Sequence, residues 1–212
     1  FMGRIIQNYY IDPDLKRQEE IENCLYMNMA SGADEIVLFT SDSPFGDKIK
    51  IVPFVGRPTF EDYFNYINSV ATEDDVSIIC NSDIFFLPKD LSVIHTRIKN
   101  DEVYALSRWD ITGLGDKLFD RDDSQDAWVF RGLVGYVDGA KETLGRAGID
   151  NAIADRLSKK GYTVLNPSRT IKSFHLHKTQ IRRYNPMDTV SKPYLLIKPH
   201  YINEKPQYRW IG

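Results

Sequence analysis

Apolar runs bounded by short polar segments recur along the chain, and the most informative of them covers residues 76–86, VSIICNSDIFF. A continuous β-branched run of this length predicts a strand that is buried on both faces. Asn81, Ser82 and Asp83 interrupt the run and would lie at the carboxyl edge of a sheet, where open α/β sheets bind ligands. A plain turn is the alternative interpretation, because Asn and Asp are common in turns.

The same reasoning predicts the remaining elements. Strands are expected over residues 4–10, 35–40, 49–54, 102–107, 127–130, 162–165 and 170–176. Helices are expected over about 13–30, 59–70, 90–99, 139–146 and 151–161, with Asp12, Thr59 and Asp90 as the caps of the first three. Residues 111–126 show no periodicity and predict a long loop of the kind that is usually functional or mobile. The alternation predicts an α/β domain with a mostly parallel central sheet flanked by helices.

Composition narrows the class of protein. The chain has 212 residues, of which 42% are hydrophobic and 27% charged, and its net charge is −3. These values indicate a globular core and argue against a nucleic-acid partner. The sequence shows no apolar stretch long enough to span a membrane and no signal peptide pattern. Cys24 and Cys80 lie in apolar contexts and are expected to be reduced, which predicts a cytoplasmic location.

Two polar motifs predict a site for a metal and a diphosphate. Asn81 and Asp83 offer two oxygen ligands at a strand end, which suits Mg²⁺ or Mn²⁺ completed by substrate phosphates. His175 and His177 alternate along the last predicted strand, so both imidazoles share one face. Lys178 and Arg182 follow and could hold phosphate oxygens. Ordinary strand histidines and a solvated basic face are the alternative.

Two carboxylates and two tryptophans are candidates for binding or activating a second substrate that carries a hydroxyl group. Asp150 begins a predicted helix and could act as general base towards a hydroxyl, while N-capping is its simpler role. Asp126 leads into a predicted strand after the long loop. Trp109 and Trp128 are either sugar platforms or core residues. The chain shows no glycine-rich phosphate loop, zinc-type cysteine pattern or nucleophile elbow, which disfavours NAD-dependent Rossmann enzymes.

With these motifs in order, the chain resembles glycosyltransferases of the GT-A fold, which use nucleotide-sugar donors. The resemblance covers nearly the whole chain, with Asn81-Ser82-Asp83 where that family carries its Asp-x-Asp metal motif. The other matching segments are 7–10, 57–60, 107–110, 125–128, 150–151 and 174–177. More narrowly, the chain is similar to a glycosyltransferase domain of chlorella viruses that takes part in building capsid glycans.

The resemblance implies Mn²⁺ or Mg²⁺ bridged to the diphosphate of a UDP-sugar. Asp83 would bind the metal together with His177, or else His175. Asn81 stands where the family has Asp, which removes one negative charge from the site. Asp150 is favoured as the base, with Asp126 close behind. Residues expected to bind the donor are Gln7, Asn8, Tyr10, Arg57, Asn81, Ser82, Lys178 and Arg182. Those expected to bind a glycan acceptor are Trp109, Asp110 and Trp128.

The expected organisation is one GT-A domain over residues 1–200, with a nucleotide-binding half (about 1–86) and an acceptor half (about 87–200). Residues 201–212 would form a strap or linker, as in a monomeric domain of a longer chain that works in the cytoplasm, or in the host cytoplasm if viral. A nucleotide- or carbohydrate-binding module without turnover is the alternative that Asn81 favours. A sugar nucleotidyltransferase ranks lower, because no glycine-rich basic loop follows the first strand. Donor sugar, acceptor, linkage and stereochemistry stay open.

Overall fold

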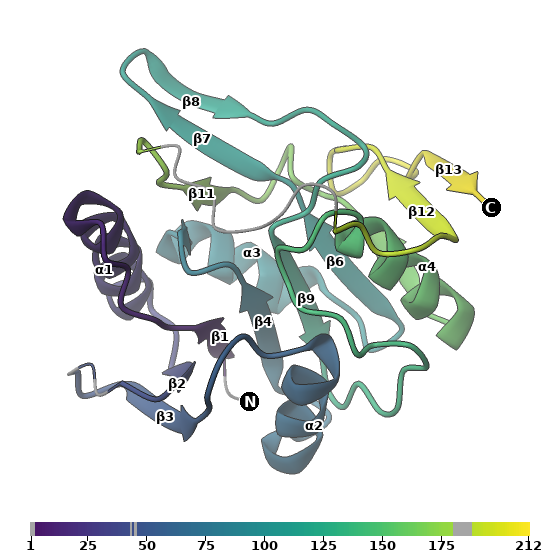
Figure 1. Ribbon diagram of the computed structural model, residues 1–212. Helices are drawn as coiled ribbons and strands as arrows, with labels where there is room; N and C mark the ends of the chain where they lie inside the picture. The colour runs from purple at the N-terminus through teal and green to yellow at the C-terminus, as the bar shows by residue number, and fades with distance from the viewer. Residues whose placement is uncertain (1–2, 43, 45, 180–187) are drawn as a thin grey trace.

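A seven-stranded sheet forms the centre of the molecule. The computed structural model describes residues 3–42, 44, 46–179 and 188–212. The strands are β1 (Gly3–Asn8), β2 (Glu35–Thr40), β3 (Ile49–Pro53), β4 (Val76–Cys80), β6 (Glu102–Leu106), β9 (Ala127–Arg131) and β10 (Thr163–Leu165). Their order is β10-β6-β9-β4-β1-β2-β3 (Figure 1). All neighbours pair in parallel except β9, which is antiparallel to β4 and β6. The predicted mostly parallel central sheet is confirmed.

Within the described residues, four helices cover the two faces of this sheet. The helices α1 (Leu15–Met29) and α3 (Pro88–Arg97) pack on one face, and α2 (Phe60–Val70) and α4 (Ile149–Lys160) pack on the other. Because side chains alternate along a strand, neighbouring residues of β4 enter different cores. Ile78 packs in the cluster of α1 and α3, and Ile79 in the cluster of α2 and α4. This double burial explains the uninterrupted apolar run. None of the described helices is long and apolar enough to cross a membrane.

A second, four-stranded sheet lies beside the carboxyl ends of the central strands. Its members are β5 (Ile84–Phe85), β7 (Arg108–Thr112), β8 (Gly115–Leu118) and β11 (Ser173–His175), in the order β5-β11-β7-β8. The hairpin of β7 and β8 extends beyond the body at the top of Figure 1. The apolar run 76–86 is therefore divided between two sheets, because a turn at 81–84 redirects the chain.

Two expectations about irregular regions were wrong, and a third region contains strands that were not predicted. Residues 111–126 include most of the β7–β8 hairpin, whose strands lack a continuous apolar signal because β7 is half-buried and β8 is mostly exposed. Residues 139–146 form no helix, since Gly139 and Gly145 have φ of 74° and 83°, outside the helical region. The segment after residue 190 forms a hairpin of β12 (Tyr194–Ile197) and β13 (Tyr208–Ile211), and its Leu195 and Ile197 join the core beside α4.

Two helix starts also differ from the expected ones. The cap of α1 is Asp14, whose side chain accepts a hydrogen bond from the Arg17 backbone at 2.9 Å. Pro88 starts α3, in agreement with the preference of proline for the first helical position. Asp90 consequently lies inside that helix, where its Oδ1 accepts a hydrogen bond from the Lys172 backbone at 2.9 Å.

The cap of α2 gives a prediction about stability. Thr59 and Asp62 form a reciprocal capping box, with the Asp62 backbone donating to the Thr59 hydroxyl at 3.2 Å and the Thr59 backbone donating to Asp62 Oδ2 at 2.8 Å. Thr59→Ala is therefore expected to lower the free energy of unfolding by about 1 kcal/mol. Urea denaturation measures it. Thr96→Ala, at an exposed site inside α3, is the control and should change it by less than about 0.5 kcal/mol. Equal losses would contradict the capping role.

Candidate functional site

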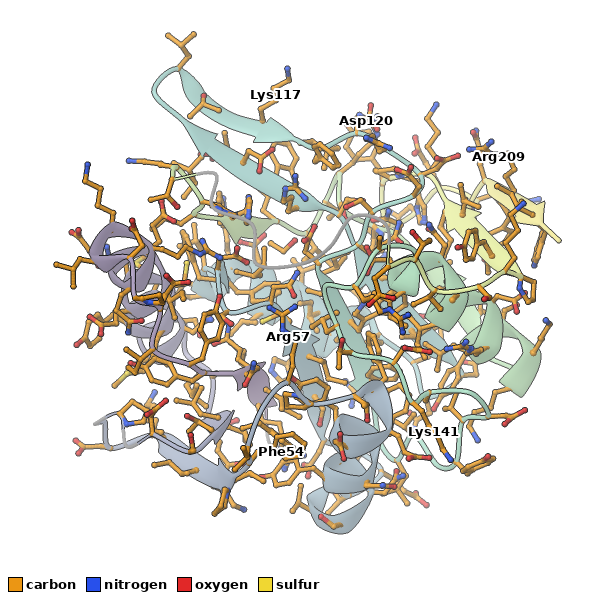
Figure 2. The ribbon with its side chains drawn as sticks, in the orientation of Figure 1. Phe54, Arg57, Lys117, Asp120, Lys141 and Arg209 are labelled. Carbon is orange, nitrogen blue, oxygen red and sulfur yellow. The ribbon has the colours of Figure 1, made fainter. Side chains whose placement is uncertain are left out.

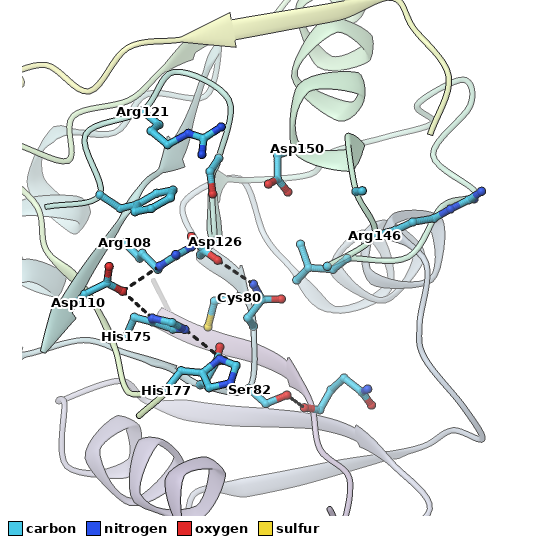
Figure 3. Close-up of a pocket in the computed structure, with 18 of the residues that line it drawn as sticks. Cys80, Ser82, Arg108, Asp110, Arg121, Asp126, Arg146, Asp150, His175 and His177 are labelled. Carbon is cyan, nitrogen blue, oxygen red and sulfur yellow. Dashed lines mark hydrogen bonds and ion pairs between the residues drawn. The ribbon is translucent and has the colours of Figure 1, made fainter. Parts of the chain in front are cut away.

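A cavity of about 870 Å³ opens at the carboxyl ends of β1 and β4 (Figure 3). Its walls include the turn after β4, strand β7 with the segment after β8, the start of α4 and the end of β11, together with residues from the end of β1, from α1 and from the region of α2. The cavity therefore collects side chains that are far apart in the sequence. It lies at the sheet edge where α/β folds bind their ligands.

Asp83, His175 and His177 converge on one wall of this cavity. Their potential ligand atoms all lie within 4.8 Å of one another. His175 Nε2 is 3.3 Å and His177 Nδ1 is 3.5 Å from the same carboxylate oxygen, Asp83 Oδ2. A backbone hydrogen bond holds the two histidines next to Asp83, because Leu176, between them, donates its N–H to Asp83 O at 3.0 Å. The structure thus brings together the three residues predicted as metal ligands.

Asp110 holds the His175 ring from behind. The pairing of β11 with β7 places His175 directly opposite Asp110, and His175 Nδ1 lies 2.7 Å from Asp110 Oδ1. Arg108 donates to the same oxygen at 2.9 Å. A carboxylate in this position orients an imidazole and leaves its other nitrogen for a metal. Asp110, predicted to bind the acceptor, lines the cavity but is engaged by His175 and Arg108.

The electrostatics keep Asp83 ionised. Burial alone would raise the pKa of Asp83, but hydrogen bonds from His175 and His177 and the charge of Arg17 hold it well below its ordinary value. Burial lowers the pKa of His175, but its hydrogen bond to Asp83 and the negative charges of Asp83 and Asp126 together outweigh that effect, so this pKa is raised. One carboxylate and two imidazoles form a mixed O/N donor set, which fits Mn²⁺ better than the oxygen-preferring Mg²⁺.

Asn81 and Gln7 shape the turn that presents Asp83. The Asn81 amide donates to Asp126 Oδ1 at 3.1 Å. Gln7 is buried, and its amide donates to the backbone oxygens of Asn81 at 2.8 Å and Ile84 at 3.2 Å. The expectation that Gln7 binds the donor is therefore corrected: its polar atoms hold the backbone of the turn. Ser82 lines the cavity and donates its hydroxyl to Asn8 O at 2.8 Å.

A smaller hollow of about 380 Å³ adjoins the cavity at the carboxyl ends of β1 and β2. Asn8, Tyr10 and Arg57, all predicted to bind the donor, line both spaces. Arg57 lies near the middle of the view in Figure 2, whereas Lys117 and Arg209 lie at the rim. Lys178 lines the main cavity. Arg182 is outside the described residues.

The two candidate bases have different surroundings. Both oxygens of Asp126 are engaged, Oδ1 by Asn81 and Oδ2 by Arg108 at 3.4 Å. Asp150, at the start of α4, lines the cavity and accepts one hydrogen bond on Oδ2 from the Gln125 backbone at 3.3 Å. Burial, and secondly the charge of Asp126, raise the pKa of Asp150 well above its ordinary value. A raised pKa makes a carboxylate a stronger base once it is ionised.

Neither tryptophan belongs to the described walls of the cavity. Trp128 is fully buried, with its ring packed edge-on against Phe60, so its predicted role in acceptor binding is wrong. Trp109, on β7, donates its indole N–H to Ser168 O at 2.8 Å and packs against the small cluster of Cys24, Phe85 and Phe174. Phe119 is an aromatic residue that does line the cavity, with Arg108 Cζ 4.0 Å from its ring centre. Sequence reasoning missed Phe119 because it lies in the stretch without periodicity.

Arg17 and Glu20 are two further site residues that the sequence did not reveal. Arg17 Nη2 donates to Asp83 Oδ2 at 2.6 Å, and Arg17 Nη1 donates to Glu20 Oε2 at 3.0 Å. Both side chains belong to an ordinary amphipathic helix, α1. No local spacing separates them from the solvated charges of the same helix.

Comparisons with known proteins show a solved structure of similar fold but no match by sequence. No protein-family model matches the sequence. No curated protein matches it either. The structure is similar to that of residues 1–349 of TarS from S. aureus, solved in complex with UDP-GlcNAc, with a TM-score of 0.52 and 11% sequence identity. The match covers 91% of this chain and 62% of that one, so this chain spans less than two thirds of its neighbour's length. The chain therefore shares the fold of that TarS fragment, with a mostly parallel α/β sheet flanked by helices.

Proposed function

We propose that this chain is a metal-dependent glycosyltransferase domain that moves a sugar from a UDP-sugar donor to a hydroxyl of a glycan acceptor. The observation that carries the proposal is the convergence of Asp83, His175 and His177 in a cavity that also contains Asp150. Support comes from the fold shared with a neighbour that was solved with UDP-GlcNAc. The donor class is transferred from that neighbour as part of the proposal.

In this proposal the two ends of the donor occupy different parts of the site. The nucleoside lies in the smaller hollow beside Asn8, Tyr10 and Arg57, and the diphosphate lies near Asp83 and Lys178. Asp83, His175 and His177 would hold Mn²⁺, which would stabilise the negative charge that builds up on the departing nucleotide. Arg57 and Lys178 orient the phosphate oxygens by charge-assisted hydrogen bonds.

Asp150 accepts the proton of the acceptor hydroxyl in this mechanism. Asp126 positions Asn81 and Arg108 and raises the pKa of Asp150 by its charge. Removal of the proton makes the acceptor oxygen nucleophilic as the bond from the sugar to the diphosphate breaks, and the transition state has oxocarbenium character as in glycoside hydrolysis. Phe119 offers an aromatic surface to a sugar on the acceptor side of the cavity.

Two further parts of the proposal concern the identity of the acceptor and the cellular location of the reaction. The resemblance of the sequence motifs to a chlorella virus domain makes a growing capsid glycan a candidate acceptor. We place the reaction in the cytoplasm, or in the host cytoplasm if the protein is viral, with the chain acting as one domain of a longer protein.

Calorimetric titration of UDP, with GDP as the control nucleotide, tests the donor and the metal together. We expect UDP to bind at least about tenfold more tightly with Mn²⁺ than without it, because a divalent cation shared with phosphate oxygens links the two ligands. GDP should bind more weakly. Release of UDP from a panel of UDP-sugars then distinguishes an enzyme from a binding module, which would release none. Absence of UDP binding under both conditions would contradict the proposed function.

A further inference from the structure

The Arg17 guanidinium occupies the carboxylate oxygen that a bound metal would use. Arg17 Nη2 lies 2.6 Å from Asp83 Oδ2, the same atom that faces His175 Nε2 at 3.3 Å and His177 Nδ1 at 3.5 Å. A guanidinium keeps its positive charge at any physiological pH and has no lone pair to offer to a metal. A divalent cation at this site therefore competes with Arg17 for Asp83.

Arg17 is firmly held in this position. Its side chain is buried, with 6% of the residue exposed, and its second nitrogen is paired with Glu20 at 3.0 Å. Glu20 in turn accepts hydrogen bonds from the backbone of Lys178 at 2.6 Å and from the backbone and hydroxyl of Thr179, both at 2.9 Å. Glu20 thus ties helix α1 to the residues that directly follow His177. The guanidinium cannot swing into solvent without breaking this buried ion pair.

The local charges are too few to hold a divalent ion tightly. Asp83 and Glu20 each carry one negative charge and Arg17 carries one positive charge, so the three groups sum to −1. The amide at Asn81 adds no charge where a second carboxylate would add one. A nucleotide diphosphate next to the ion would supply the missing negative charge. Like charges close together in a buried site disfavour one another's binding.

We propose that Arg17 makes metal binding conditional on the donor, so that the divalent ion enters the site together with the UDP diphosphate and binds weakly alone. This inference rests on the proposed function and names a positioning and selectivity role for Arg17 that goes beyond it. By thermodynamic linkage, the factor by which UDP strengthens Mn²⁺ binding equals the factor by which Mn²⁺ strengthens UDP binding.

Titration of Mn²⁺ into the protein, with and without saturating UDP, tests the inference, and a titration of Mn²⁺ into UDP alone is subtracted. In the parent protein, UDP should raise the Mn²⁺ affinity at least about tenfold, within the usual range of coupling between sites. Arg17→Gln should bind Mn²⁺ alone about tenfold more tightly than the parent and should show a smaller effect of UDP, because one repelling charge is gone. Arg17→Lys keeps the charge and should resemble the parent. Arg97→Gln, an exposed site on α3, controls for net charge.

Two results would overturn the role of Arg17. One is a folded Arg17→Lys variant that binds Mn²⁺ alone about tenfold more tightly than the parent, because the positive charge is then not what weakens metal binding; this result decides the question even if Arg17→Gln does not fold. The other is an Arg17→Gln variant whose affinity for Mn²⁺ alone equals that of the parent. A parent protein that binds Mn²⁺ equally tightly with and without UDP would instead contradict the metal dependence of the proposed function itself. If the parent protein binds UDP but takes up no Mn²⁺ beside it, the metal part of the proposed function fails instead, and the two failures are thereby distinguished.

Discussion

Asp83→Asn is expected to abolish the dependence of UDP binding on Mn²⁺. The substitution keeps the shape of the side chain but removes the negative charge on which Arg17, His175 and His177 converge. Loss of an outer carboxylate that only orients a ligand costs about 10- to 100-fold in metal affinity, so loss of the ligand itself should cost at least about 100-fold. Calorimetry of UDP with and without Mn²⁺ measures this.

Two controls keep the interpretation of Asp83→Asn clear. Asp123→Asn removes a carboxylate from the same cavity, where Asp123 is paired with Arg121 at 2.6 Å, and should leave the effect of Mn²⁺ unchanged. Asp110→Asn should give an intermediate loss, because Asp110 orients His175. Thermal unfolding establishes that each variant is folded. If folded Asp83→Asn still shows an effect of Mn²⁺ on UDP binding, the metal does not bind at this site.

Asp150→Asn is expected to slow sugar transfer by about 10²- to 10⁴-fold, which is the usual contribution of a general base. UDP affinity should stay at the parental value, because Asp150, at the start of α4, lines the main cavity but not the smaller hollow in which the nucleoside is proposed to lie. UDP release from the active UDP-sugar, with acceptor present, measures the rate. Transfer at the parental rate would pass the role to Asp126, and if Asp126→Asn is also without effect, to the leaving phosphate.

The pH dependence separates a base from a merely structural residue. Because burial and Asp126 raise the pKa of Asp150, the parental transfer rate should fall as the pH drops through that raised pKa. Asp126→Asn removes one cause of the shift and should move this acidic limb to lower pH. An acidic limb that stays in place in Asp126→Asn would argue against Asp150 as the titrating base.

The same shift predicts how Asp150→Asn affects stability. A carboxyl whose pKa is raised by folding binds its proton more tightly in the folded state, so it contributes stability at low pH that is lost as the pH rises through the folded pKa. Asparagine carries no charge and avoids this loss. The variant should therefore be at least as stable as the parent at neutral pH, and urea denaturation of both proteins measures this. A clearly lower stability of the variant would contradict the raised pKa of Asp150 and would make unfolding the reason for lost activity.

The sequence by itself determined the strands of the central sheet and the part of the candidate site that holds Asp83, His175 and His177. Strand β4 was evident because burial on both faces requires an unbroken apolar run, and Asp83 stood out because polar residues must follow where such a strand leaves the core. The alternation of His175 and His177 placed both imidazoles on one face for the same local reason. Patterns such as these are local, because they depend only on which side chains of a single segment face the core.

Only the tertiary structure decided which distant residues meet Asp83. Strand β11 reaches it by pairing with β5 and β7, and that pairing sets Asp110 behind His175. Arg17 reaches it from α1, where its helical spacing looks like that of any surface charge. Trp128 could be a platform or a core residue by its sequence, and its fully buried position became known only from the packing against α2. Contacts between segments far apart in the chain depend on how whole elements pack, and no local pattern of hydrophobic and polar residues carries that information.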